Sequence, residues 1–140
     1  MSGLLETAVV VTESGNGPYA QFVTAGRHVM GADEPERLGG RDTGPSPYDF
    51  LLAGLGACTA MTMRIYATKH AWHVERISVD LRHEKFAVSG TTVKCDRFER
   101  VITLIGQLTA EQRAQLLEIA DKCPVSQTLR QPSVVISHLA

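Results

Sequence analysis

The sequence predicts an α+β fold with an antiparallel sheet. Runs of β-branched and aromatic residues separated by turn signals precede residue 36, and a period-two alternation of apolar and polar residues begins after residue 72. Between them lies one long apolar segment that opens with a helix-capping pattern. The expected order is β-β-(β)-α-β-β-α-α-β, in one domain that covers residues 1–140.

The composition is that of a globular protein. Hydrophobic residues make up 44% and charged residues 21%, and the net charge of −1 argues against binding to nucleic acid or anionic membranes by surface charge. Glu6 interrupts the apolar N-terminal stretch, which lacks the basic start of a signal peptide. The most apolar run, residues 50–63, is shorter than the ~18 residues that span a bilayer. We expect a soluble, cytoplasmic protein.

The first third of the chain reads as strands followed by a loop. Residues 5–12 and 20–26 are β-rich and flank a turn signal at residues 14–18, which predicts a hairpin. Residues 27–35 offer a third strand. Residues 34–47 are dense in glycine, proline and charge, and we expect them to form an exposed loop that could carry a site.

A long helix should follow, from Pro47 to about Lys69. Ser46 suits the N-cap and Asp49 completes a capping-box spacing. Residues 50–63 are apolar on nearly every face, and a helix that is apolar all round is normally buried all round. One small chain can hardly surround such a helix, so a sheet or a second subunit should cover it.

The remaining elements alternate between strand and helix. Residues 77–81 and 98–108 read as two strands. A capping box at residues 109–112 opens a helix whose inward side chains are expected to be Leu116, Leu117 and Ile119. Pro124 then opens a short helix through Leu129, and residues 134–136 should form a last strand.

Three cysteines are the candidates for chemistry. Their odd number and the absence of a C-x-x-C spacing argue against a disulfide framework and a zinc site. Cys58 lies in mid-helix, where it is either a buried core residue or a reactive thiol. Gly54 and Gly56 precede it, each at a helix cost of ~1 kcal/mol relative to alanine, which indicates that another helix or a substrate channel approaches the backbone there.

Cys123 occupies the N-cap of the helix that Pro124 opens. Unpaired backbone N–H groups, the helix dipole and Lys122 would all favour its thiolate; the alternative is an exposed cysteine at a helix joint. Cys95 has no evident chemical partner. His70 and His73 flank Trp72 without a third ligand, so neither a metal nor a cofactor is expected.

Two segments resemble the OsmC/Ohr family of osmotically inducible and organic hydroperoxide resistance proteins. They are GPSPYDFLLAGLGACTAMTMRIYA, which contains Cys58, and KCPVSQTL, which contains Cys123. The similarity extends from about residue 28 to residue 139. Within the family, these segments and DRFERVITLIG…EQRAQLLEIADKCPV look most like the YhfA-type branch.

The resemblance implies an OsmC-like fold in an intertwined homodimer, in which sheets from both chains wrap the long cysteine-bearing helices. It also implies thiol-dependent reduction of small hydrophobic hydroperoxides. By this analogy Cys58 is the peroxidatic thiolate, Cys123 is the resolving thiol, and an external dithiol reduces the disulfide.

The sequence departs from the peroxidase branches at the start of the helix. Those branches place a glutamate directly after the helix-opening proline and use an arginine from the preceding loop to activate the cysteine. Here Tyr48 holds that position and Asp49 follows it, while the loop offers Arg37 and Arg41. These four residues are candidate accessory groups. Two other functions remain open: a thiol enzyme acting on another electrophile, and a module that binds a small hydrophobic ligand with non-catalytic cysteines.

Overall fold

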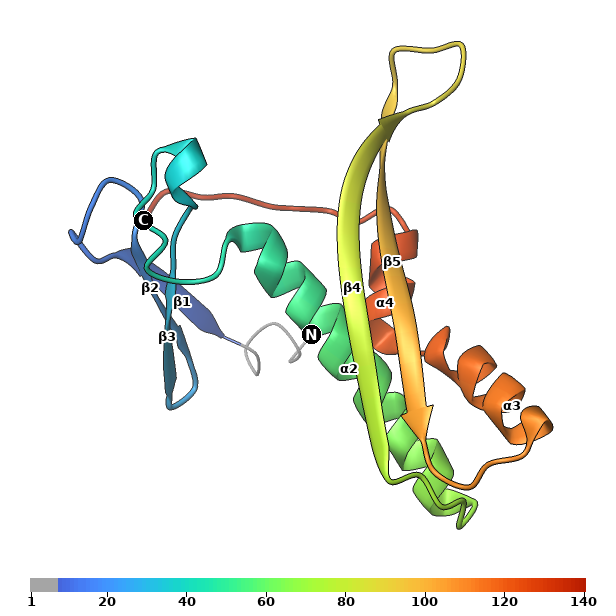
Figure 1. Cartoon of the computed structure of the whole chain (residues 1–140). Coiled ribbons are helices and arrows are strands. Elements are labelled where there is room, and N and C mark those ends of the chain that lie inside the picture. Colours follow the sequence, from blue (N-terminus) through green and yellow to red (C-terminus); the bar gives the residue numbers. More distant parts are fainter. Residues whose placement is uncertain (1–7) are drawn as a thin grey trace. The chain divides into compact units, whose positions relative to one another are not determined.

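The computed structural model describes residues 8–140, so the part of the first predicted strand before residue 8 lies outside the described residues. The chain divides into two compact units, one that ends at Leu51 and one that spans Leu52–Ala140. The elements labelled in Figure 1, together with the 3-10 helix η1, are, in chain order, β1 (Val9–Glu13), β2 (Gln21–Ala25), β3 (His28–Ala32), η1 (Glu36–Leu38), α2 (Pro47–Lys69), β4 (Arg76–Ala87), β5 (Lys94–Ile105), α3 (Ala110–Ala120) and α4 (Pro124–Arg130).

The first unit contains a three-stranded antiparallel sheet in the order β1-β2-β3. Glu13 pairs with Gln21 across the first turn, and Ala25 pairs with His28 across the second. Gly26 adopts φ +62° in the second turn, a left-handed conformation that glycine reaches without strain. The predicted hairpin and the third strand are therefore confirmed in the described residues.

One buried carboxylate organises the loop after β3. Asp33 is 3% exposed and accepts hydrogen bonds from the backbone N–H groups of Glu34, Arg41 and Thr43, and from the Thr43 hydroxyl at 2.7 Å. The Thr43 hydroxyl and these N–H groups hold the pKa of Asp33 below its usual range, although burial acts in the opposite direction. The loop is mostly exposed, as predicted, but it has an internal anchor.

Helix α2 begins and ends where the sequence predicts. The Ser46 hydroxyl accepts a hydrogen bond from the Asp49 N–H, and the Asp49 carboxylate accepts one from the Ser46 N–H, so the capping box is present. The single chain does not surround α2, as expected for a chain of this size, because Met61 and Ile65 are exposed. The residues that it buries are Leu55, Gly56, Thr59, Met63 and Ala67.

By length and composition, α2 could also cross a membrane, with a mean hydropathy of 1.3 over its most apolar window. Its inward face, however, packs on protein. A Cβ on Gly56 would lie 2.6 Å from the Leu81 Cδ1 atom of β4, so the missing side chain lets the strand approach the helix. The predicted close approach is confirmed at Gly56, whereas nothing lies within 4 Å of a Cβ on Gly54.

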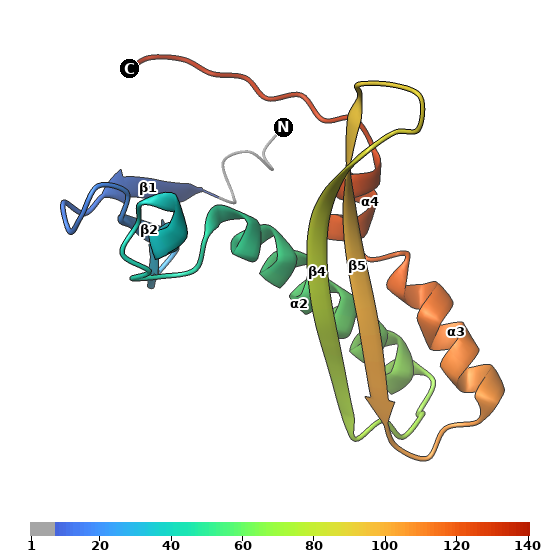
Figure 2. The same ribbon diagram turned by 45° about the horizontal axis from the view of Figure 1, so that its top comes forward.

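In the second unit, β4 and β5 form a long twisted hairpin, and α2 lies beside the part of it that is away from the turn (Figures 1 and 2). Arg76 pairs with Ile105 at one end of the hairpin and Ala87 with Lys94 at the other. Both strands extend closer to the hairpin turn than their sequence patterns indicated. Residues 94–97 therefore belong to β5, and the strand ends before residues 106–108.

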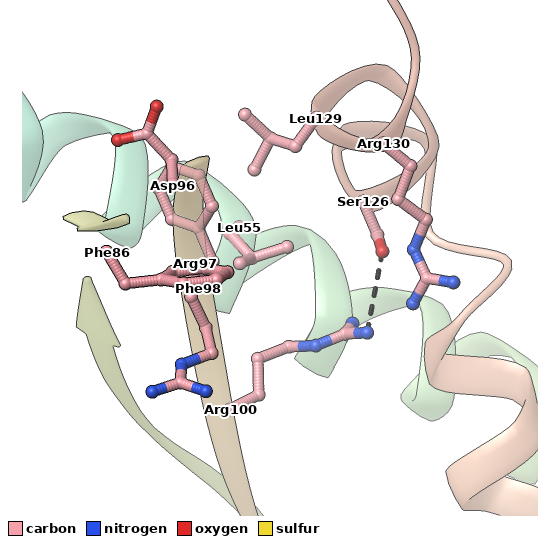
Figure 3. A pocket seen from close by; sticks show the side chains of 9 residues that line it. All are labelled: Leu55, Phe86, Asp96, Arg97, Phe98, Arg100, Ser126, Leu129 and Arg130. Carbon is pink, nitrogen blue, oxygen red and sulfur yellow. Dashed lines mark hydrogen bonds between the residues drawn. The ribbon is translucent and has the colours of Figure 1, made fainter. Parts of the chain in front are cut away.

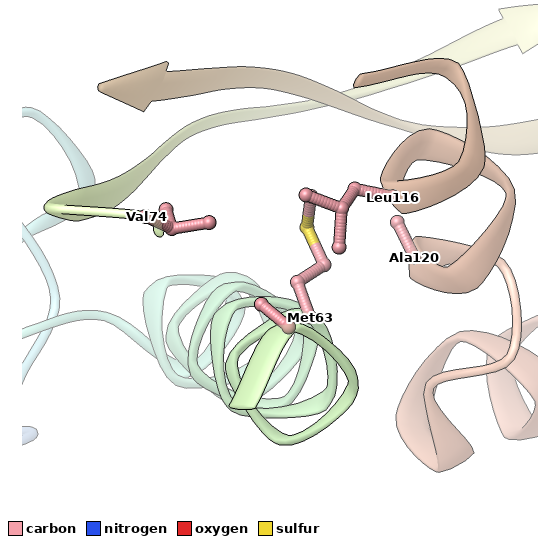
Figure 4. Close-up of a cluster of buried hydrophobic side chains, with 5 residues drawn as sticks. Met63, Val74, Leu116 and Ala120 are labelled. Carbon is pink, nitrogen blue, oxygen red and sulfur yellow. The ribbon is translucent and has the colours of Figure 1, made fainter. Parts of the chain in front are cut away.

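The core of this unit joins α2, α3 and the segment before β4. Met63 and Leu116 are fully buried and face each other between the two helices, with Val74 and Ala120 beside them (Figure 4). Ile77, Ile102 and Leu104 of the hairpin pack against this cluster, together with Tyr66, Trp72 and Leu108. Each large apolar side chain that is fully buried stabilises the fold by about 1.5–3 kcal/mol, and this burial holds α2 and α3 against the strands.

In the C-terminal part of the chain, one predicted feature is confirmed and two are wrong. Thr109 and Gln112 form the predicted capping box of α3. Leu116 and Ile119 point inward as expected, but Leu117 is exposed, so that assignment was wrong. Residues 134–136 form no strand in the structure and are exposed, since no neighbouring strand of the described chain pairs with their backbone.

Candidate thiol site

The second unit brings Cys58 and Cys123 into contact. Cys58 lies on α2, half-buried, one residue before the inward-facing Thr59. Cys123 is fully buried at the N-cap of α4, where the sequence placed it. Both are free thiols, and they lie close enough for each to shift the pKa of the other. We call these two residues the thiol pair.

Further donors surround the Cys123 sulfur. The Ser126 N–H donates to it at 3.4 Å, and the Val125 N–H also points toward the pair. The Thr59 hydroxyl lies 3.9 Å from the same sulfur and 2.6 Å from the Leu55 carbonyl oxygen. A hydroxyl has one proton, so Thr59 can donate to only one of these acceptors at a time, and the shorter contact is with the carbonyl.

These contacts separate the pKa values of the two thiols. Burial raises the pKa of Cys123, but the hydrogen bonds from Cys58, Ser126, Thr59 and Val125 outweigh it and leave that pKa below its usual range. Burial raises the pKa of Cys58, and the hydrogen bond to Cys123 and the charge on that sulfur raise it further. The two pKa values thus move in opposite directions, which favours Cys123 as the first thiol of the pair to ionise.

Arg100 of β5 is a site residue that the sequence reasoning missed. Its side chain is 12% exposed, and one nitrogen donates to the Thr59 hydroxyl at 3.0 Å and to the Ala120 carbonyl oxygen at 2.9 Å. The other nitrogen donates to Asp121 at 3.0 Å and to the Ser126 hydroxyl at 3.4 Å. Arg100 lies on a strand with many charged residues, and only the packing of α2, α3 and α4 shows that it turns inward.

The proposed accessory residues belong to the first unit. Arg37 lies in η1 and is exposed, and the Arg41 side chain passes close to Gly17 of the first turn. Tyr48 is 43% exposed on the first turn of α2, and Asp49 is engaged in the helix cap. The roles of these four residues toward Cys58 stay predictions.

Cys95 lies apart from the pair. It is exposed on β5, opposite Phe86 of β4. His70 stacks on Tyr66 at 4.0 Å between ring centroids, and His73 is exposed beside Glu75. Among residues 8–140, no group of three His, Cys, Asp or Glu side chains is arranged to hold a metal ion.

A cleft of about 450 Å³ lies near the thiol pair (Figure 3). Its lining includes Leu55 and Ser126, each three positions in the chain from one of the two cysteines, but neither cysteine itself. Phe86, Phe98 and Leu129 add apolar walls, and the charged residues around it are Asp96, Arg97, Arg100 and Arg130. Much of its lining is thus apolar, with several guanidinium groups at its edge.

Comparison with known proteins gives one family match. The sequence model of the OsmC family, described as "OsmC-like protein", matches residues 40–138. No curated protein matches the sequence significantly.

Solved structures share the fold. A putative osmotic stress induced and detoxification response protein from Psychrobacter arcticus 273-4 has a TM-score of 0.73 at 18% identity, over 87% of each chain. An organic hydroperoxide resistance protein OsmC from Legionella pneumophila has 0.65 at 19% identity, over 88% of this chain and 89% of that one. The organic hydroperoxide resistance protein OhrB of Bacillus subtilis has 0.62 at 20% identity, over 88% and 90%. At these identities the likeness concerns the fold alone.

Proposed function

This chain belongs to the OsmC-like protein family, and from that premise we propose that it reduces organic hydroperoxides with Cys58 and Cys123. The observation that carries the proposal is the proximity of two free thiols on different elements of the fold: the hydroxyl of Thr59, the residue after Cys58, lies 3.9 Å from the Cys123 sulfur, and each thiol shifts the pKa of the other. Two sulfurs in contact can pass from dithiol to disulfide with little movement of the backbone. The hydroperoxide-resistance names of several structural neighbours support the same chemistry.

Exposure assigns the order of attack. Cys58 is partly exposed, so a peroxide can reach its sulfur, whereas Cys123 is fully buried. Cys58 is nevertheless the thiol with the raised pKa. The two facts agree if the neighbouring Cys123 thiolate accepts the Cys58 proton as Cys58 attacks. Cys123 then acts first as a base and afterwards as the resolving thiol.

The steps balance. The Cys58 sulfur attacks one peroxide oxygen as its proton moves to Cys123, the O–O bond breaks, and the leaving alkoxide takes that proton to become an alcohol. Cys58 is now a sulfenic acid. The Cys123 thiolate attacks the Cys58 sulfur, the S–S bond forms, and hydroxide leaves to become water with a solvent proton. An external dithiol restores both thiols and becomes a disulfide itself.

The cleft beside the pair favours an organic substrate. Leu55, Phe86, Phe98 and Leu129 offer apolar contact to an alkyl or aryl group, which hydrogen peroxide lacks. We expect cumene or tert-butyl hydroperoxide to be reduced faster than hydrogen peroxide.

A homodimer and a cytoplasmic location complete the proposal. The apolar outer face of α2, with Met61 and Ile65, and the exposed apolar residues 134–136 are surfaces that a second copy would cover. A dithiol that must be restored after each turnover needs a reducing compartment, which is why the proposal places the protein in the cytoplasm.

The test is turnover of tert-butyl hydroperoxide with a dithiol reductant. Cys58→Ser should abolish turnover, and Cys123→Ser should lower it by roughly 100-fold because both base and resolving thiol are lost. Cys95→Ser is the matched control, since that cysteine lies away from the pair, and should retain full activity. Equal activity of Cys58→Ser and the unaltered protein would refute the proposal.

The same experiment separates the two other functions. If the unaltered protein binds hydrophobic hydroperoxides but loses no thiols, the cleft is a binding module. If the thiols react with other electrophiles much faster than with any hydroperoxide, the protein is a thiol enzyme of another kind.

A further inference from the structure

Arg100 contacts both of the elements that carry the thiol pair. On one side its guanidinium donates to the hydroxyl of Thr59, the residue after Cys58 on α2. On the other side it donates to the Ala120 carbonyl oxygen and to the Ser126 hydroxyl, which lie on either side of Cys123 in the chain. One side chain of β5 thus joins α2 to the α3–α4 junction.

Arg100 and the Cys123 sulfur contact the same two residues. The hydroxyl oxygens of Thr59 and Ser126 accept hydrogen bonds from the guanidinium, while the Ser126 N–H donates to the sulfur at 3.4 Å and the Thr59 hydroxyl lies 3.9 Å from it. The guanidinium therefore holds in place the residues that contact the sulfur.

The charges near the pair leave a positive excess. Asp121 accepts from Arg100 at 3.0 Å and from Arg130 at 2.8 Å through the same oxygen, so two cations share one carboxylate. Lys122 adds another cation next to Cys123 in the chain. Arg100 is the least exposed of these ionised groups, and a buried charge is screened less by solvent.

We propose that Arg100 is the positioning residue of the thiol pair: it holds α2 against the α3–α4 junction and places a positive charge beside the residues that contact the Cys123 sulfur, which favours the ionised form of one sulfur of the pair. In this chain the cation of the site comes from β5. The proposal rests on the pairing of Cys58 and Cys123, but it does not require that a hydroperoxide is the substrate.

A merely structural brace would predict a different result. If Arg100 only tied the elements together, its replacement would lower the free energy of unfolding without changing the ionisation of a thiol in the folded protein. If Arg100 positions and charges the site, replacement shifts the pH at which the first thiolate forms.

The experiment measures thiolate formation by ultraviolet absorbance across pH, in full-length protein carrying Cys95→Ser so that the exposed thiol is silent. Arg100→Met should raise the midpoint of the first ionisation by about one pH unit or more. Arg100→Lys keeps the charge but loses the forked hydrogen bonds, so its midpoint should fall between those of the parent and Arg100→Met. Arg64→Met is the control. Arg64 lies on α2, the helix of Cys58, and like Arg100 it donates to a backbone carbonyl oxygen, in this case that of Val74.

An unchanged midpoint in folded Arg100→Met, or an equal shift in Arg64→Met, would overturn the inference. If Arg100→Met does not fold, Arg100→Lys is the test. An unchanged midpoint in Arg100→Lys together with a lowered free energy of unfolding would show that Arg100 has only a structural role. Hydroperoxide turnover is assayed separately. If the midpoint shifts in Arg100→Met but the parent protein turns over no hydroperoxide, the role of Arg100 stands and the proposed function is rejected. If the parent turns over hydroperoxide normally but the midpoint does not shift, the proposed function stands and the role of Arg100 is rejected.

Discussion

The hydroxyl of Thr59 lies 3.9 Å from the sulfur of Cys123, although 64 positions separate the two residues in the chain. Because Thr59 directly follows Cys58 on α2, this contact places Cys58 beside the N-cap of α4, where Cys123 lies. The core around Met63 and Leu116 supports this packing one turn further along α2. The thiol pair is thus set by packing between helices.

The first prediction concerns the charge on Cys123. Replacing Cys58 with alanine removes a hydrogen-bond donor to the Cys123 sulfur, so the pKa of Cys123 should rise. In protein that also carries Cys95→Ser, the ultraviolet absorbance of the Cys123 thiolate should then reach its midpoint at a higher pH than the first ionisation of the protein that carries Cys95→Ser alone. That single variant, which retains both thiols of the pair, is the reference. A lower midpoint in Cys58→Ala would show that the charge resides on the other sulfur.

Two glycines of α2 provide a matched test of the packing between α2 and β4. Gly54→Ala should raise the free energy of unfolding by about 1 kcal/mol, since alanine is the better helix former and nothing lies within 4 Å of its Cβ. Gly56→Ala should be less stable than Gly54→Ala by at least about 1 kcal/mol, because Leu81 must move. Urea denaturation measures both. Equal stability of the two variants would contradict the packing described for β4.

Asp33 should make the first unit sensitive to acid. Its pKa in the folded protein lies below the unfolded value, so its carboxylate stabilises the fold above the unfolded pKa, and this contribution is lost as the pH falls through the folded pKa. Asp33→Asn should therefore have a lower melting temperature near neutral pH and a smaller further decrease in acid. Thermal unfolding between about pH 7 and about pH 2 would show it. If the melting temperatures of the two proteins fall in parallel as the pH is lowered, Asp33 does not anchor this loop.

The outer face of α2 tests the proposed dimer. Met61→Glu places a charge on an exposed apolar face, and we expect it to dissociate the dimer and expose apolar surface. Sedimentation at micromolar concentration measures the mass of both proteins. Gln107→Glu adds the same charge at an exposed polar position and should remain a dimer. A folded monomer of the unaltered chain would contradict the proposal.

Local signals in the sequence predict most of this fold. Capping residues mark the start of α2, α3 and α4, and the expected positions of Ser46, Thr109 and Cys123 are confirmed. These signals are reliable because a cap acts through hydrogen bonds within one turn of the chain. The thiol pair could be anticipated only through the family resemblance, since no spacing rule connects positions 58 and 123.

Features that depend on neighbours were missed. Leu117 follows Leu116 in the sequence, but about 100° of helix rotation separates them, and only Leu116 meets Met63. Residues 134–136 have the composition of a strand, yet a strand needs a partner backbone. Arg100 looks like another surface charge until α2 and the α3–α4 junction enclose it. In each case a contact between distant segments decides the role.

The most direct test of the account is to oxidise the full chain with one equivalent of cumene hydroperoxide, digest it without reduction, and identify the linked peptides. The account predicts the loss of two free thiols per chain, a single Cys58–Cys123 link that a dithiol reverses, and an unmodified Cys95. A Cys58–Cys95 link, or the loss of no thiol at all, would contradict the central claim that Cys58 and Cys123 act as one redox pair.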